Sequence, residues 1–100
     1  MGVFAETNFE ITCKNKTSAL KVKQELKEMM KVSDENQNFK FGMIEQYVHV
    51  VYGKLSSGRM QNLEWQCEQI WERIAKIRGV EEANFPFMIE DNGRFFTNEE

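Results

Sequence analysis

The chain has 100 residues, a net charge of −3, 41% hydrophobic and 29% charged residues, values typical of a folded protein rather than a disordered or fibrous one. We therefore expect a single domain over residues 1–100. No apolar run approaches the roughly 18 residues that a membrane span needs, and the N-terminus lacks the pattern of a signal peptide. The acidic balance argues against a general nucleic-acid binder, and two cysteines in such a chain suggest reduced thiols in the cytoplasm.

The start of the chain predicts a strand followed by a helix. Phe9, Ile11 and Cys13 alternate with polar residues, which is the period of a half-buried strand. Over residues 17–32 the apolar residues instead fall three and four apart, as on one face of a helix. They are Ala19, Val22, Leu26, Met29 and Met30. A hydroxyl of Thr17 or Ser18 is expected to cap the first turn, and the polar stretch 33–38 to form a loop.

Residues 39–55 form the second region that favours strands, because aromatic and β-branched residues dominate it. Its length exceeds that of a typical strand, so we predict a hairpin that turns within residues 42–46. No Asn-Gly or Asp-Gly pair marks that turn. A single long, bent strand is the alternative.

The last part of the chain predicts a second helix and then two more strands. From Met60 to Ile77 apolar residues recur three and four apart, and Gly79 stands where a C-terminal cap belongs. Ser56 or Ser57 is available as the N-terminal cap. Phe85, Phe87 and Ile89 then alternate as a strand, and a turn signal over 91–94 predicts a short return strand at Phe95 and Phe96.

The element order is therefore β-α-β-β-α-β with a short C-terminal β-extension. This order predicts the α+β class and a ferredoxin-like antiparallel sheet with two helices on one face. An α+β sheet whose middle segment is one strand is the alternative. Neither arrangement fixes an activity, because this layout hosts many unrelated functions.

Residues suited to catalysis or metal binding are few. His49, the one histidine, lies within a strand-forming run with no nucleophile and orienting group in a local motif beside it. Cys13 and Cys67 both point inward by pattern and lack the close spacing of a zinc site. No glycine-rich phosphate loop occurs. We therefore expect no catalytic residues, no metal and no cofactor.

The second predicted helix carries a large aromatic residue on its outer side. On a helical wheel Trp65 lies about 170° from the apolar stripe, whereas Trp71 lies roughly 70° from it, at the core margin. Exposed tryptophan is common at protein interfaces. We therefore predict a partner-binding surface made of Trp65, Gln61, Glu64, Glu68, Gln69 and Glu72.

Charge on this helix fits a basic or hydrogen-bonding partner. Glu64, Glu68 and Glu72 stack four residues apart, where like charges mildly destabilise a helix. The alternative is that Trp65 is covered by its own helix or by residues 91–100, and that Glu72 pairs with Lys76.

Three functions follow from these features. The first is a small non-enzymatic cytosolic protein that binds a partner protein and regulates or inhibits it, of the immunity or phage and mobile-element antagonist type. The second is a homodimeric ligand-binding protein or small enzyme with an apolar pocket on the sheet face. That pocket would be lined by His49, Tyr47, Phe41 and Tyr52. The third is nucleic-acid binding through a lysine stripe formed by Lys16, Lys23, Lys27 and Lys31, which the net charge disfavours.

Overall fold

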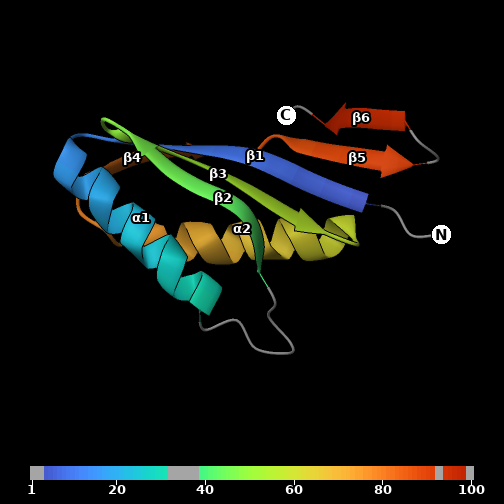
Figure 1. Cartoon of the computed structure of the whole chain (residues 1–100), viewed down its shortest axis with the longest axis horizontal. Helices are drawn as coiled ribbons and strands as arrows, with labels where there is room; N and C mark the ends of the chain where they lie inside the picture. The colour runs from blue at the N-terminus through green and yellow to red at the C-terminus, as the bar shows by residue number, and fades with distance from the viewer. Residues whose placement is uncertain (1–3, 32–38, 92–93, 99–100) are drawn as a thin grey trace.

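The computed structural model describes residues 4–31, 39–91 and 94–98. In chain order the elements are β1 (Phe4–Cys13), α1 (Lys16–Lys31), β2 (Lys40–Tyr47), β3 (Val50–Ser57), α2 (Met60–Ile74), β4 (Val80–Asn84), β5 (Phe87–Asp91) and β6 (Arg94–Asn98). The strands form one antiparallel sheet in the order β2-β3-β1-β5-β6, and β4 also pairs with β1. Both helices lie on the same side of this sheet (Figure 1).

The predicted α+β class, with an antiparallel sheet and two helices, is confirmed. The ferredoxin-like order is not matched exactly, because two strands in succession occupy one edge of β1. β4 pairs with residues 10–13 of β1, and β5 pairs with residues 4–7. Phe85 and Pro86 separate them, since proline has no amide hydrogen to give to the ladder. β6 then pairs with β5, as the predicted C-terminal extension requires.

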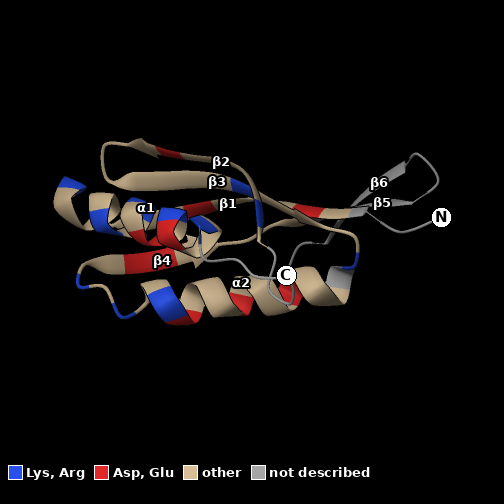
Figure 2. Ribbon diagram, turned by 60° about the horizontal axis from the view of Figure 1, so that its bottom comes forward, with Lys and Arg blue, Asp and Glu red and all other residues tan. Residues whose placement is uncertain are grey.

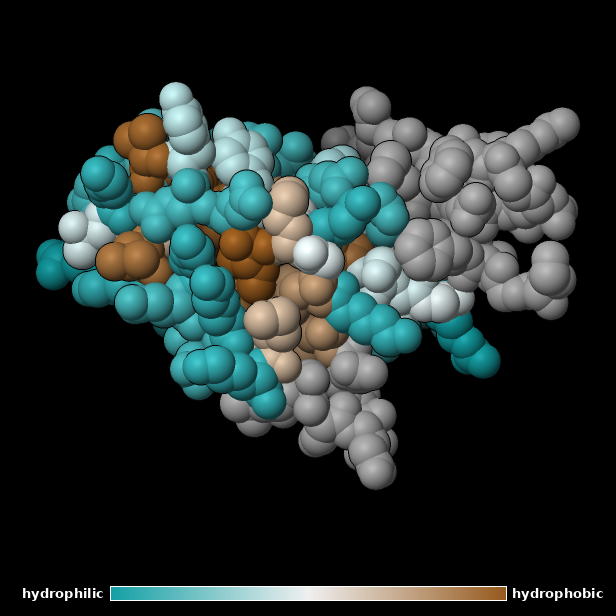
Figure 3. Space-filling model, viewed as in Figure 1, coloured by the Kyte–Doolittle hydropathy of each residue, from teal (hydrophilic) through white to brown (hydrophobic). Residues whose placement is uncertain are grey.

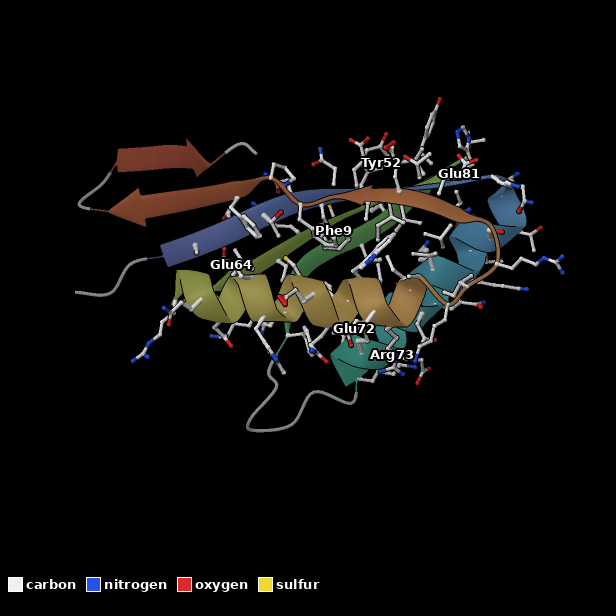
Figure 4. The ribbon with its side chains drawn as sticks, turned by 180° about the vertical axis from the view of Figure 1, so that it is seen from behind. Phe9, Tyr52, Glu64, Glu72, Arg73 and Glu81 are labelled. Carbon is white, nitrogen blue, oxygen red and sulfur yellow. The ribbon has the colours of Figure 1, made fainter. Side chains whose placement is uncertain are left out.

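The core lies between the helices and the sheet. On β1 the buried side chains alternate, with Phe9 and Ile11 facing the helices, as the sequence period predicts. Figure 4 shows Phe9 between the sheet and α2, and Tyr52 on the opposite face of the sheet. The helices contribute most of the remaining buried residues, which are Ala19, Val22, Leu26, Met29, Leu63, Cys67, Ile70 and Ile74.

The start of α1 differs from the prediction in its cap. The side-chain oxygen of Asn15 accepts a hydrogen bond from the amide of Ser18 at 2.8 Å, so Asn15 caps the helix rather than Thr17 or Ser18. Ser18 is buried, and its hydroxyl donates to the carbonyl of Arg78 at 2.7 Å. An asparagine side chain satisfies the free amides of the first turn as well as a serine or threonine does. Ser18 makes a tertiary hydrogen bond instead.

α2 is shorter than predicted at its C-terminal end. The helix ends at Ile74, and Gly79, with φ +98°, lies in the following turn and not at the cap. At the N-terminal end Arg59 is the cap residue and makes no side-chain capping bond. The hydroxyl of Ser57 instead accepts hydrogen bonds from the amide of Arg59 at 3.3 Å and from the Asn62 side chain at 2.8 Å.

The predicted turn within 42–46 is wrong. The register pairs Tyr47 with Val50, so the hairpin turns at Val48 and His49. Val48 has φ +55°, a backbone conformation that is unfavourable for a β-branched residue. Because valine stands where a turn normally has glycine or asparagine, the sequence gives no turn signal at this position. Gly42 instead falls at an irregularity in the register between Phe41 and Met43.

Some predicted features fall outside the described residues. These are the loop 33–38, the centre of the turn at Asn92 and Gly93, and the side chains of Met60, Ile89, Phe95 and Phe96. Among the described residues, no helix combines the length and apolar character that crossing a membrane requires.

Candidate functional site

The two tryptophans of α2 lie on different sides of the helix. Trp65 is 38% exposed, in agreement with its predicted place opposite the apolar stripe. Trp71, predicted at the core margin, is instead 40% exposed, about as much as Trp65, and lines a groove between α2 and the strands β4 and β5. The groove lies on the side of α2 that faces β4 and β5, and not on the outer side that carries Trp65.

The groove has a volume of about 760 Å³. Its apolar lining comes from both sides: Cys67 and Trp71 from α2, and Ala83, Phe85 and Phe87 from β4, β5 and the link between them. Its remaining lining residues are Glu64, Glu68 and Glu72. The groove therefore brings together half of the predicted partner-binding residues, and it does not include Trp65, Gln61 or Gln69.

The aromatic wall of the groove is continuous with the core. The ring of Phe85 packs against the buried ring of Phe9, with centroids 5.5 Å apart. Phe9 also meets Phe41 edge to face at 6.2 Å. Because interiors are close-packed, these contacts hold Phe85 in place without any ligand. The groove wall is thus preformed.

The acidic side of the groove is formed by the three glutamates, which are all exposed. Within residues 4–31, 39–91 and 94–98, none of the three has an ion-pair partner. The alternative pairing of Glu72 with Lys76 therefore does not occur. Figure 2 shows acidic residues on β4 as well as along α2, whereas basic residues concentrate on α1. Unpaired like charges beside an apolar surface attract a cationic ligand.

The thiol of Cys67 also lines the groove. Burial raises the pKa of this thiol to about 12, and the carboxylate of Glu64 adds to the shift. Because the thiolate is the reactive form, Cys67 is a poor nucleophile at neutral pH. Burial likewise raises the pKa of Cys13, with a smaller contribution from Glu81. Both cysteines are free and buried, as their pattern predicts.

The alternative pocket around His49 is not assembled. His49 is exposed in the β2–β3 turn, and Tyr47, at the end of β2, is 72% exposed. Phe41 packs against the core on the helix side, whereas Tyr52 is exposed on the other face. Phe41 and Tyr47 are an even number of positions apart, but the register irregularity between Phe41 and Met43 places them on opposite faces, which the sequence spacing alone does not indicate. The structure therefore does not bring these four residues together in one pocket.

Most of the described residues on the open sheet face are polar, although Tyr52 is also exposed there. Lys54 and Glu6 form an ion pair there, with Nζ and Oε2 3.7 Å apart. Asn8 and Glu10 are also exposed on this side of β1. A wet, charged face does not favour packing of two such sheets against each other.

A second hollow lies between α1 and the edge strand β2. Figure 3 shows apolar atoms gathered where these elements meet, amid a mostly hydrophilic surface. The hollow has a volume of about 190 Å³ and includes the half-buried Phe41 and Ile44 with the exposed Met43. It is much smaller than the groove, and Lys27 is the charged residue in its lining.

The lysine stripe of α1 lies on the surface. Lys16, Lys27 and Lys31 are exposed, and Lys23 is half-buried. Glu25 of α1 pairs with Arg73 of α2, with a contact between the guanidinium Nε and the carboxylate. The basic face is therefore accessible, and an ion pair joins the two helices beside it.

In the part of the chain that the structure describes, no three histidine, cysteine or acidic side chains are placed to hold a metal ion. Comparison with protein-family models, with curated proteins and with solved structures finds no match to this chain. The function must therefore be argued from the site itself.

The sequence did not indicate the strand side of the groove. Ala83, Phe85 and Phe87 meet α2 only because β4 and β5 follow β1 along one edge. The position of Trp71 at the core margin was the one signal, since a large aromatic residue there has space to line a cleft.

Proposed function

We propose that this chain is a small non-enzymatic binding protein that holds a basic, partly apolar segment of a partner protein in the groove beside α2. The observation that supports this most is the set of three carboxylates next to the apolar wall of Trp71 and Phe85. Glu64, Glu68 and Glu72 have no ion-pair partner among the described residues. Holding such a segment would regulate or inhibit the partner.

The physical basis is the pairing of charge and aromatic surface. A lysine or arginine of the partner can form ion pairs with the carboxylates of the groove, and an arginine can also stack on the indole of Trp71. Apolar residues of the same segment fill the space against Phe85 and Phe87. The volume of about 760 Å³ falls within the range of ligand sites, about 300–1,000 Å³. Tryptophan and arginine are also the usual dominant residues of protein interfaces.

Two finer statements belong to the same proposal. The strands β2, β3, β1 and β4 with the two helices are consistent with a ferredoxin-like unit, to which β5 and β6 are added. Two free, buried thiols suit a reducing compartment. These thiols support our proposal of a cytoplasmic location.

The proposal is tested with a short fluorescein-labelled peptide in which lysine and leucine alternate, with binding followed by anisotropy. The same peptide with glutamate in place of lysine is the probe for charge. The lysine peptide should bind and the glutamate peptide should not, because the groove carries unpaired carboxylates. Equal binding of both peptides would contradict the proposal.

Two pairs of variants localise the binding. Trp71→Ala should weaken binding roughly thirtyfold or more, as for an interface hot spot, while Trp65→Ala on the same helix should change it less than about twofold. Glu68→Lys should weaken it about fivefold or more, whereas Glu28→Lys, an equal charge change on exposed α1, should have little effect. A loss on Trp65→Ala with none on Trp71→Ala would place the partner on the outer side of α2.

A further inference from the structure

The free edge of β4 is a feature that the proposed function does not yet use. β4 pairs with β1, and no other strand in the described part of the chain pairs with it. β6 lies beside β5, and its last residue Asn98 is opposite Phe87. The position beside β4, in line with β6, is therefore open among these residues. An unpaired strand edge is a template for a further strand.

The hydrogen bonds at the end of β1 show which way its backbone groups point. The amide of Cys13 donates to the carbonyl of His49 at 2.9 Å, toward β3. The amide of the next residue, Lys14, donates to the carbonyl of Gly79 at 2.7 Å, toward β4. These directions alternate from residue to residue along an antiparallel strand.

The same alternation assigns the backbone groups of β4. The amide of Cys13 points toward β3, and β1 pairs with β3 without a break over residues 5–12, so Thr12 and Glu10 point toward β4. They form the bonded pairs with Glu82 and Asn84, on one side of the register irregularity between Thr12 and Cys13. Ala83 lies between those two residues. Its N–H and C=O therefore point away from β1, toward the open position.

The side chains around that position are acidic on both faces. Ala83 lines the groove together with Trp71, so every second side chain of an added strand would enter the groove. The other side chains would lie on the open sheet face next to Glu82. This face is assigned because Glu82 is opposite Thr12, and side chains directly opposite share a face. Glu82 is exposed.

We propose that the partner segment binds as an added β-strand on the free edge of β4, with basic and apolar side chains among those that enter the groove and basic side chains next to Glu82. This inference rests on the proposed function, because it assumes that the groove receives the segment. Main-chain hydrogen bonds would supply affinity and the groove would supply specificity, as in other cases of strand addition. Pro86 follows β4, so the new ladder is limited to residues 80–84.

Backbone N-methylation of the lysine–leucine peptide tests the inference. In an extended peptide all leucine amides face one edge and all lysine amides face the other. Methylation of the set of amides that faces β4 should weaken binding about tenfold or more, because each methyl group removes a hydrogen-bond donor and blocks the approach of the peptide to β4. Methylation of the other set should change binding less than about twofold. Equal effects of the two sets would overturn strand addition.

Hydrogen exchange of the Ala83 amide provides the matching readout on the protein. The amide should exchange rapidly in the free chain and at least about tenfold more slowly with saturating peptide, since a hydrogen-bonded amide is protected. Unchanged exchange would overturn the inference. If the peptide still binds through Trp71 in that case, the proposed function stands alone; if no peptide binds, both fail. Protection in the free chain, with a dimer in light scattering, would assign the edge to a second copy and overturn the inference.

Discussion

The substitution Gly53→Ala should destabilise the fold strongly, because Gly53 lies directly opposite Phe9 in the β1–β3 ladder. A methyl group at position 53 would lie 2.1 Å from Cζ of Phe9, whereas carbon atoms in contact are normally about 3.5–4.0 Å apart. The ring cannot yield easily. It is 1% exposed and packs against Phe41 and Phe85.

The expected cost follows from the size of this overlap. Overpacking a close-packed core costs typically about 1–3 kcal/mol, and an overlap with a fixed ring belongs at the upper end. We expect Gly53→Ala to lower the free energy of unfolding by about 3 kcal/mol, or the melting temperature by roughly 12–24 °C for a chain of this size. Urea and thermal unfolding followed by circular dichroism measure both. A cost below about 1 kcal/mol would refute the reasoning.

Two further variants make the test specific. Gly58→Ala introduces a methyl group that meets nothing within 4 Å, so its stability should stay within about 0.5 kcal/mol of wild type. The double variant Phe9→Leu/Gly53→Ala should be more stable than the sum of the two single effects predicts, by about 1.5 kcal/mol, because the shorter side chain makes room for the methyl group. Additive effects would show that the two residues do not clash.

The other predictions concern stability at separate sites. Val48→Gly should raise the free energy of unfolding by roughly 0.5–1 kcal/mol in urea unfolding, because relief of the left-handed backbone exceeds the added chain entropy; a loss of stability would contradict this. Ser18→Ala should cost about 1–2 kcal/mol in the same assay, since the carbonyl of Arg78 loses a partly buried hydrogen bond from the Ser18 hydroxyl; an unchanged midpoint would be inconsistent. Burial raises the pKa of Cys67 from 9.0 to about 12, so the folded chain keeps a proton that the unfolded chain loses. That contribution is complete below pH 9.0 and is lost toward pH 12. Urea unfolding of Cys67→Ala should therefore show a shallower loss of stability above pH 9.0 than wild type, and equal slopes would oppose the assignment.

Hydrophobic periodicity predicted most elements because it reports which face of each is buried. The stripe on α2 that includes Leu63, Ile70 and Ile74 is buried as expected. Periodicity did not predict the features that burial does not determine, which are the hairpin turn and the helix cap. Val48 turns the hairpin against its own conformational preference, and Asn15, just before α1, caps the helix through a single local hydrogen bond.

The site was only partly predictable from the sequence. Glu64, Glu68 and Glu72 are identified by spacing on one helix, a local property. Trp71 and Phe85 meet across the groove only through the pairing of β4 with β1, which joins residues far apart in the chain. The wheel directed attention to Trp65, because it reports exposure and not what lies opposite an exposed residue.

The most direct test of the proposed site uses the indole signals of the two tryptophans. In a ¹⁵N-correlated NMR titration with the lysine–leucine peptide, we predict that the Trp71 indole signal moves together with the amides of Cys67 and Ala83. The Trp65 indole signal should stay in place, because Trp65 does not line the groove. Movement of Trp65 with a fixed Trp71, or shifts confined to the lysines of α1, would contradict the binding site that we propose.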